Sequence, residues 1–341
     1  MTLTPDNRRM SKPFVIVSHQ LPAEWIVSLQ AECEVLVGPP TSVSAELTPQ
    51  LHAQLPQADA LLTMLTVPVD ETLLAKAPRL RILSQMAVGV NNIDLSACTT
   101  RGIPVGHTPG VLTAATADLA MTLLLAAARR LPEASADARA GRWGTWSPIG
   151  WIGAELEGAT LGIIGMGRIG LATAKRAKAF GMNILYHSRS EHPEAHTTVN
   201  AHRVELDELL QRCDFVSLHT PLTDATHHLI NADTLRQMKP SAILINTARG
   251  GVIDQVALEA ALRHGTIRAA ALDVTDPEPL PPTHPLYTLP NCLIAPHIGS
   301  ATERTRRRMA ERACVNLLAG LRGERIPFCA NPAVYNRHYP D

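Results

Sequence analysis

Three side chains that could assist the reduction of a carbonyl group stand in separate segments of the second half of the chain. Arg249 lies in TARGG, Glu278 in DPEPLPP and His297 in APHIGS. An imidazole titrates near neutral pH and can give a proton to an oxygen, and a nearby carboxylate would hold the ring and favour its protonated form. A guanidinium can bind a carboxylate and polarise a neighbouring carbonyl. These groups match what reduction of a 2-oxo acid needs, apart from a hydride donor.

A glycine-rich turn indicates where a hydride-carrying dinucleotide binds. Residues 160–170, TLGIIGMGRIG, form an apolar run followed by G-x-G-x-x-G at Gly165, Gly167 and Gly170. The first glycine permits a sharp turn, the second lets backbone approach a pyrophosphate, and the third lets the next helix pack on its strand. The N-H groups at the start of that helix then face the phosphates. The alternative is a purely structural turn between a strand and a helix.

The end of the second strand of this series favours NADPH over NADH. Where an Asp or Glu for the ribose 2'-hydroxyl is expected, the chain has Ser188, Arg189 and Ser190. A guanidinium pairs with phosphate oxygens, and a carboxylate there would repel a 2'-phosphate. We therefore predict NADPH as the preferred cofactor, with NADH also possible. The alternative is that Arg189 is only a solvated loop residue.

Other polar or glycine-containing segments also follow predicted strands. Ligands of open parallel sheets collect beyond the carboxyl ends of the strands. Backbone N-H groups around Val88 and Gly89 could hold the second side of a substrate carboxylate, because glycine permits close approach. Taken singly, Arg249, Glu278 and His297 each have a structural alternative as turn or loop residues. Their joint placement after successive strands favours a common site.

The order of apolar runs predicts the fold class. Short apolar runs alternate with helical patterns along nearly the whole chain, which is typical of α/β proteins with parallel sheets. Since the glycine pattern opens the second series, we predict two doubly wound domains. A flavodoxin-like substrate domain covers 1–109 and 299–341, and a Rossmann NADP-binding domain covers 110–298. The last helix is expected over 300–321, with Ser300 and Glu303 as a capping box.

Composition gives no indication of nucleic-acid binding, membrane association, secretion or metal binding. The 341 residues carry 31 basic and 31 acidic side chains, which gives no reason to expect nucleic acid or a membrane surface as a partner. The first 13 residues are polar and predict neither a signal peptide nor an anchor. Six cysteines without C-x-x-C pairs fit reduced thiols in a cytoplasmic protein. His192 and His196 lack further ligands, so no metal is expected.

Several segments together resemble the D-isomer-specific 2-hydroxyacid dehydrogenases. They are 165–170, 247–251, 273–279 and 296–300, in the family's order, and the resemblance as a whole covers nearly the whole chain after its first residues. Within that family the chain is most similar to glyoxylate/hydroxypyruvate reductases, on RRLPEA (129–134), YHSRS (186–190), LDVTDPEPLPPTHPL (272–286) and the pair Trp143 and Trp146. The resemblance implies NADPH-dependent reduction of glyoxylate to glycolate and of hydroxypyruvate to D-glycerate.

The resemblance also implies roles for single residues. Arg249 would clamp the substrate, Glu278 would set the protonation of the imidazole, His297 would donate the proton, and Asp273 would face the nicotinamide carboxamide. The candidate cofactor-binding residues are Thr116, Gly165, Gly167, Arg168, Ile169, Gly170, Ser188, Arg189, Ser190, Pro221, Thr247, Ala248, Asp273 and Gly299. The candidate substrate-binding residues are Val88, Gly89, Arg249, His297, Ser300 and Trp146.

Two further expectations come from the same resemblance. Members form homodimers through the nucleotide domain, and 115–141 is typical of the helical arm that they use. Trp146 would then lie near the partner's active site, and a core or surface tryptophan is the alternative.

Other functions stay open at this point. One is an NAD-dependent enzyme of the D-lactate or 3-phosphoglycerate type. Another is a nucleotide-sensing scaffold similar to transcriptional co-repressors of this fold. A formate dehydrogenase is disfavoured, because Glu278 stands where that subgroup would be expected to have Gln.

Overall fold

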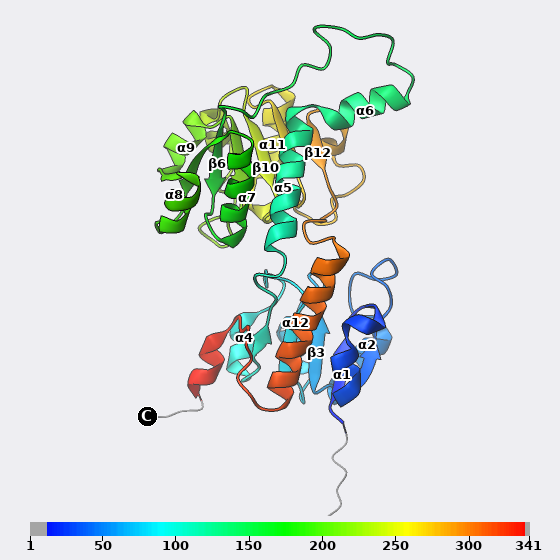
Figure 1. Cartoon of the computed structure of the whole chain (residues 1–341). Coiled ribbons are helices and arrows are strands. Elements are labelled where there is room, and N and C mark those ends of the chain that lie inside the picture. Colours follow the sequence, from blue (N-terminus) through cyan, green and yellow to red (C-terminus); the bar gives the residue numbers. More distant parts are fainter. Residues whose placement is uncertain (1–11, 338–341) are drawn as a thin grey trace, which may run out of the picture. The chain divides into compact units, whose positions relative to one another are not determined.

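The computed structural model describes residues 12–337, which divide into two compact units (Figure 1). One unit comprises the chain up to Val111 together with the chain from Glu303 onward, and the other is Leu112–Thr302. The second unit is therefore inserted into the sequence of the first. Most of the polar leader lies outside the described residues. The assignment of a substrate role to the first unit and a nucleotide role to the second stays a prediction.

The first unit contains a five-stranded parallel sheet. Its strand order is β2-β1-β3-β4-β5, the flavodoxin-like order. Ile16 of β1 pairs with Leu36 on one side and with Leu61 on the other. The strands are β1 (Phe14–Val17), β2 (Glu34–Val37), β3 (Ala60–Thr63), β4 (Ile82–Gln85) and β5 (Val105–Gly106). The helices are η1 (Ala23–Trp25), α1 (Val27–Glu32), α2 (Pro49–Gln54), η2 (Leu55–Gln57), α3 (Glu71–Ala75), α4 (Leu95–Thr100), α12 (Glu303–Leu321) and η5 (Pro332–Arg337).

Helix α12 returns the chain to the first sheet and packs on β3 and β4. A Cβ atom at Gly320 would lie 2.8 Å from the Ile82 side chain, so the close contact of helix and strand requires glycine there. The expected capping box at Ser300 is wrong, because α12 begins only at Glu303. The carbonyl of Ser300 instead accepts a hydrogen bond from the amide of Thr302 at 2.7 Å, which forms a tight turn before the helix.

The second unit contains a seven-stranded parallel sheet of order β12-β11-β10-β9-β6-β7-β8. Counted from β6, this is the Rossmann order, extended by one strand, with its switch point between β6 and β9. The strands are β6 (Thr160–Ile164), β7 (Asn183–His187), β8 (His202–Arg203), β9 (Phe215–Leu218), β10 (Ile243–Asn246), β11 (Ala269–Leu272) and β12 (Cys292–Ile294). The helices are α5 (Thr113–Ala128), α6 (Leu131–Arg139), α7 (Arg168–Ala179), α8 (Pro193–Val199), α9 (Leu206–Arg212), α10 (Ala232–Gln237), η3 (Gly250–Val252), α11 (Gln255–Arg263) and η4 (Pro285–Thr288). The two sheets confirm the predicted fold class.

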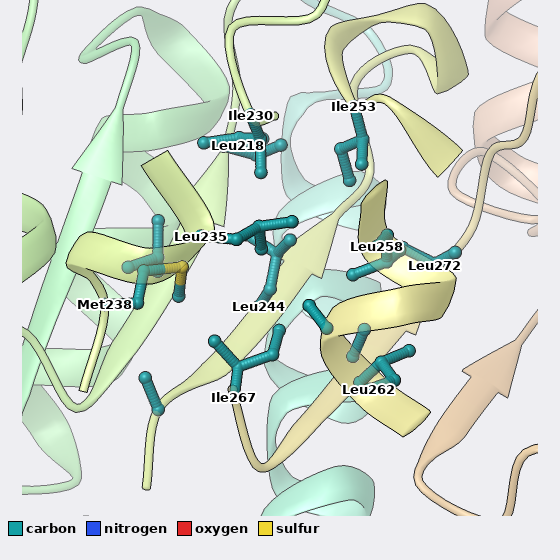
Figure 2. Close-up of a cluster of buried hydrophobic side chains, with 14 of the residues drawn as sticks. Leu218, Ile230, Leu235, Met238, Leu244, Ile253, Leu258, Leu262, Ile267 and Leu272 are labelled. Carbon is teal, nitrogen blue, oxygen red and sulfur yellow. The ribbon is translucent and has the colours of Figure 1, made fainter. Parts of the chain in front are cut away.

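Both faces of the seven-stranded sheet are buried. Leu244 of β10 packs in a cluster that includes Leu218 and Leu258 (Figure 2). Its neighbours Ile243 and Ile245 belong to a second cluster, because successive side chains of a strand point to opposite faces. A strand buried on both faces has apolar residues throughout, so polar chemistry is left to the strand ends.

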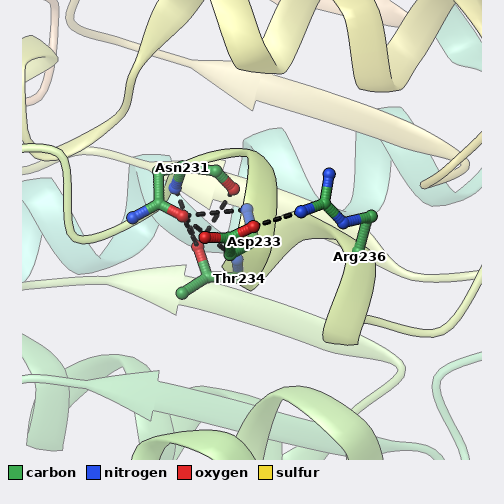
Figure 3. A network of polar contacts seen from close by, with 4 residues as sticks. All are labelled: Asn231, Asp233, Thr234 and Arg236. Atoms are coloured by element: carbon green, nitrogen blue, oxygen red, sulfur yellow. Dashed lines mark hydrogen bonds and ion pairs between the residues drawn. The ribbon is translucent and has the colours of Figure 1, made fainter.

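Helices α10 and α11 of the second unit begin at side-chain caps. At α10 the Asn231 side chain accepts hydrogen bonds from the amides of Asp233 and Thr234 at 2.9 and 3.2 Å (Figure 3). The Thr234 hydroxyl accepts in return from the Asn231 amide at 2.7 Å, which completes a capping box. Arg236 pairs with Asp233 one turn along the helix. The caps of α10 and α11 fix where these two helices start after their loops.

The expected helical arm 115–141 consists of two helices, α5 and α6. The break occurs at Arg130, which adopts a left-handed backbone conformation with φ of 51°. After α6 the chain forms an irregular segment in which Trp143 and Trp146 are 77% and 81% exposed. Among residues 12–337, no helix combines the length and the apolar character needed to cross a membrane.

Candidate active site

The glycine-rich turn joins β6 to α7 as the sequence predicts, and each glycine has a distinct reason. Gly165 has a φ of 97°, and an added Cβ would lie 2.8 Å from the backbone of His219. A Cβ at Gly170 would lie 2.3 Å from the Gly165 carbonyl oxygen. At Gly167, by contrast, a Cβ would meet no atom within 4 Å. The turn therefore leaves open space in front of the backbone of Gly167, as binding of a pyrophosphate requires.

Arg168 and Ile169 form the first turn of α7, where the unpaired N-H groups and the positive end of the helix dipole favour an anion. Gly167 is the N-cap residue, and no side chain caps the helix. This end of α7 is thus available to phosphate groups. The glycine turn and the helix start together fit a dinucleotide.

The Ser188, Arg189 and Ser190 segment follows β7 directly. The Ser188 hydroxyl donates to the Ser190 carbonyl at 3.0 Å and lies 3.1 Å from Nε2 of His192, so it is used within the turn. Nε of Arg203 donates to the Ser188 carbonyl at 2.9 Å. The Arg189 side chain is exposed, and no hydrogen bond of its guanidinium is recorded among the described residues. The turn is held from within while the guanidinium of Arg189 faces solvent.

The residues after β10 are held by a side chain that the sequence analysis did not single out. Asn246, fully buried at the end of β10, accepts from the Ala248 amide at 2.9 Å and donates to the Arg249 carbonyl at 2.8 Å. Within the described part of the chain, the Thr247 hydroxyl oxygen is buried and has no hydrogen-bond partner. The Thr247 hydroxyl is therefore available to a bound group, as are the hydroxyls of Thr108 and Thr173, which are buried in the same way. The signal in the sequence was an asparagine at the end of the apolar run AILIN.

His297 and Glu278 form a direct pair. Nδ1 of His297 lies 2.5 Å from a carboxylate oxygen of Glu278. The side chains are 28% and 41% exposed, so the pair is accessible from outside the protein. Because the carboxylate takes up Nδ1, Nε2 is the ring nitrogen left for another partner, and none is recorded for it in residues 12–337. The two predicted side chains are therefore in direct contact, and their roles in proton transfer stay a prediction.

Asp273 holds the loop that carries His297. Its side chain is 2% exposed, and its two carboxylate oxygens accept from the amides of Ile298 at 2.7 Å and of Gly299 at 2.8 Å. Burial raises the pKa of Asp273, while these two bonds and the charge of His297 lower it. Gly299 is also bonded through its carbonyl to the hydroxyl of Thr116 at 3.2 Å. The contact of Asp273 with a carboxamide stays a prediction.

Arg249 is half-buried at the start of η3, after the turn held by Asn246. Its Nη1 donates to the Ala248 carbonyl at 2.7 Å. Burial lowers the pKa of the Arg249 guanidinium, and the charge of Glu278 raises it. The guanidinium and the Glu278 carboxylate thus interact electrostatically in the same unit. The structure brings Arg249, Glu278 and His297 together at the carboxyl ends of neighbouring strands.

The remaining predicted residues fall into three places. Pro221 follows β9 in the second unit, and Ser300 is half-buried directly after Gly299. Val88 and Gly89 follow β4 in the first unit, where both are half-buried. Trp146 belongs to the exposed segment after α6. Within residues 12–337, no group of three or more His, Cys, Asp or Glu side chains is arranged to hold a metal ion.

Comparisons with known proteins show to which proteins this chain is similar. A model of the D-isomer specific 2-hydroxyacid dehydrogenase NAD binding domain matches residues 121–299. A glyoxylate reductase from Thermococcus litoralis is 46% identical over 338 residues, covering 96% of this chain and 100% of that protein. The TT0316 protein from Thermus thermophilus has a TM-score of 0.86 and 48% identity, covering 93% of this chain and 99% of that chain. An NADPH-dependent glyoxylate/hydroxypyruvate reductase from Sinorhizobium meliloti, solved with NADP and malonate, has a TM-score of 0.80 and 31% identity, covering 95% and 98%.

His219 generates a prediction about stability. Its ring lies 2.9 Å from the Ser217 hydroxyl, and burial lowers the pKa of the His219 imidazole to about 4 from 6.5. The unfolded chain then takes up a proton at a higher pH than the folded chain does. The neutral His219 therefore does not reduce the free energy of unfolding above pH 6.5. As the pH falls from 6.5 toward 4, the free energy of unfolding should decrease by up to about 3 kcal/mol.

We expect His219→Gln to reduce that loss, because glutamine keeps a polar contact with Ser217 but does not titrate. The measurement is the free energy of unfolding in urea for both proteins between pH 7 and pH 4.5. The wild-type protein should lose about 2 kcal/mol more than the variant over this interval. Parallel curves for the two proteins would show that His219 does not stay neutral in the folded state.

Proposed function

The chain belongs to the D-isomer specific 2-hydroxyacid dehydrogenase family, and from this premise we propose that it is an NADPH-dependent glyoxylate/hydroxypyruvate reductase. As a member of the family it is an oxidoreductase of small 2-oxo and 2-hydroxy acids. The observation that carries the proposal is the His297–Glu278 pair beside Arg249, in the same unit as the glycine-rich turn. Relatives named glyoxylate reductase align along nearly the whole chain, which supports glyoxylate as a substrate.

In the proposed reaction His297 donates a proton from Nε2 to the carbonyl oxygen of the substrate. When bound, NADPH supplies the hydride that reduces the carbonyl carbon, so that a 2-oxo acid becomes a 2-hydroxy acid. Glu278 holds the ring through Nδ1, which leaves Nε2 to face the substrate. Arg249 binds the substrate carboxylate and polarises the carbonyl, which stabilises the negative charge that develops on its oxygen.

Further residues would hold the substrate. We propose that the backbone N-H groups of Val88 and Gly89 bind its carboxylate and that Ser300 lies beside it. Trp146 would limit the size of the substrate side chain in a homodimer. Its 81% exposure, together with that of Trp143 and Ile149, supports an interface formed by the segment after α6, because exposed apolar clusters typically mark interaction surfaces.

The proposed preference for NADPH rests on Arg189. Its guanidinium is exposed after a turn that is fixed from within, so it can pair with a 2'-phosphate without rearrangement of that turn. One structural neighbour is named NADPH-dependent. The residues at the glycine turn, Thr116, Pro221, Thr247 and Ala248 would line the cofactor, and Asp273 with Gly299 would lie at its nicotinamide end. We place the enzyme in the cytoplasm.

The function is tested by initial rates of the purified protein. We expect oxidation of NADPH with glyoxylate and with hydroxypyruvate, and a lower kcat/KM with NADH and with bulky oxo acids such as phenylpyruvate. Turnover of only bulky aromatic oxo acids would contradict the substrate proposal. Efficient use of NADH with pyruvate or with 3-phosphohydroxypyruvate would indicate the D-lactate or 3-phosphoglycerate type. Binding of NADPH without turnover would favour a nucleotide-sensing scaffold.

Removing the proton donor should affect turnover and not cofactor binding. We expect His297→Ala to lower kcat for glyoxylate by about a hundredfold or more, because general acid catalysis contributes roughly that much. The dissociation constant for NADPH, measured by fluorescence titration, should stay within about twofold. His264→Ala, at an exposed histidine that ends α11, is the matched control and should keep wild-type rates. Unchanged turnover of His297→Ala would remove its proposed role.

Removing the Arg189 guanidinium should weaken the binding of NADPH but not that of NADH. Since hydrogen bonds to charged groups are worth about 1.5–3 kcal/mol, Arg189→Ala should raise KM for NADPH roughly tenfold or more. KM for NADH, which lacks the 2'-phosphate, should stay nearly constant. Arg212→Ala, at an exposed arginine of α9 that pairs with Glu208, serves as the control. An equal loss for both cofactors would contradict the assignment to a 2'-phosphate.

A further inference from the structure

Three consecutive backbone carbonyl groups in the turn after β4 form hydrogen bonds to other groups of the first unit. The Ala87 carbonyl accepts from the Thr108 amide at 2.8 Å. The Val88 carbonyl is bonded to Nδ1 of His107 at 2.9 Å, and the Gly89 carbonyl accepts from Nε2 of Gln85 at 2.8 Å. Two of the three donors belong to side chains that the sequence analysis did not select.

The orientation of these carbonyls determines where the N-H groups of the turn point. A trans peptide is planar, with its N-H directed opposite to its C=O. The peptides of the turn are trans, since the cis bonds of the described chain are at Pro277 and Pro279. The N-H groups of Val88, Gly89 and Val90 therefore point away from the three groups that hold the carbonyls. Within residues 12–337 no hydrogen bond is recorded for any of these three N-H groups.

Consecutive N-H groups without partners form a site for an anion. Successive free backbone donors attract carboxylates and phosphates. Val88, Gly89 and Val90 are half-buried, so a small anion can reach them. The turn is thus already arranged for a carboxylate before any ligand binds.

The Gln85 side chain is itself fixed. It is fully buried, and its Oε1 accepts from the Thr63 hydroxyl at 3.1 Å and from Nδ2 of Asn92 at 2.9 Å. Its Nε2 also donates to Oδ1 of Asn92 at 2.6 Å, so the two amides pair reciprocally. Nδ2 of Asn92 donates further to the Val67 carbonyl at 2.7 Å. Three hydrogen bonds besides the one to the Gly89 carbonyl thus hold the Gln85 amide in this orientation.

His107 is fixed in a similar way through its backbone. Its amide donates to the Phe328 carbonyl at 3.0 Å, and its carbonyl accepts from Nδ2 of Asn316 on α12 at 3.1 Å. Since the Val88 carbonyl can only accept a hydrogen bond, Nδ1 of His107 must carry the proton. An asparagine at this position would carry an N-H donor at the same number of bonds from the backbone.

We propose that His107 and Gln85 are positioning residues for the substrate carboxylate. By holding the carbonyls of Val88 and Gly89 inward, they direct the N-H groups of the turn toward the carboxylate of a 2-oxo acid. This inference rests on the proposed function, in which the same turn binds that carboxylate. Loss of the hydrogen bond from either His107 or Gln85 should therefore weaken the binding of carboxylates. The affinity for NADPH should not change.

The experiment compares three variants with the wild-type enzyme. His107→Phe keeps the ring and removes the donor, and it should raise both KM for glyoxylate and Kd for oxalate, measured by calorimetry, about tenfold. KM for NADPH should not change. His107→Asn restores a donor and should stay within about threefold of the wild type. Gln85→Glu places an oxygen opposite the Gly89 carbonyl and should raise the same two constants.

His52→Phe is the matched control, because His52 is a half-buried histidine on α2 in the same unit. It should leave KM and Kd unchanged. The inference is overturned when the wild type reduces glyoxylate but His107→Phe and Gln85→Glu keep its KM and Kd, or when His52→Phe raises them equally. Absence of both glyoxylate reduction and oxalate binding in the wild type overturns the inference together with the proposed function. Oxalate binding that depends on His107 without glyoxylate reduction supports the carboxylate site and overturns only the proposed function.

Discussion

The candidate acid–base pair depends on a buried carboxylate. His297 adopts a left-handed backbone conformation with φ of 51°, which costs a non-glycine residue roughly 1–2 kcal/mol. Asp273 maintains it, because its carbonyl accepts from the His297 amide and its carboxylate accepts from the next two amides. Burial of that carboxylate is itself unfavourable without such bonds. The loop and the carboxylate therefore stabilise each other, and together they place the imidazole against Glu278.

The parallel sheets explain why the polar candidate residues lie at the ends of strands. The middle of β10 is apolar on both faces, since Leu244 contributes to one core cluster and Ile243 to the other. A polar residue can enter such a strand only at its end, as Asn246 does, where it can bond to the following loop. In the first unit Gln85 ends β4 and bonds to its own loop in the same manner. The last residue of a parallel strand is thus fixed by the sheet, and its side chain can orient the loop that follows.

The sequence predicted the elements better than it predicted the contacts between them. The apolar runs and the glycine pattern indicated the two parallel sheets and the turn at Gly165, because period and turn residues are local properties. The start of α12 at Glu303 and the break at Arg130 were not predicted, since loop contacts override local propensity there. The roles of Asn246 and His107 in holding loops were also missed. Each is a polar residue at the end of an apolar run, and only the fold reveals which carbonyl it reaches.

The groups that stay free in this protein are determined by the groups that are already bonded. Glu278 occupies Nδ1 of His297, so Nε2 is the ring nitrogen that is left for another partner. His107 and Gln85 occupy carbonyls, so the N-H groups of their peptides remain for an anion. A site of this kind is preorganised because its donors do not have to exchange partners when a ligand arrives. In the proposed site, residues that do not contact the substrate therefore determine which atoms are free to bind it. A comparison restricted to substrate-contacting residues would not reveal whether those atoms are oriented for binding.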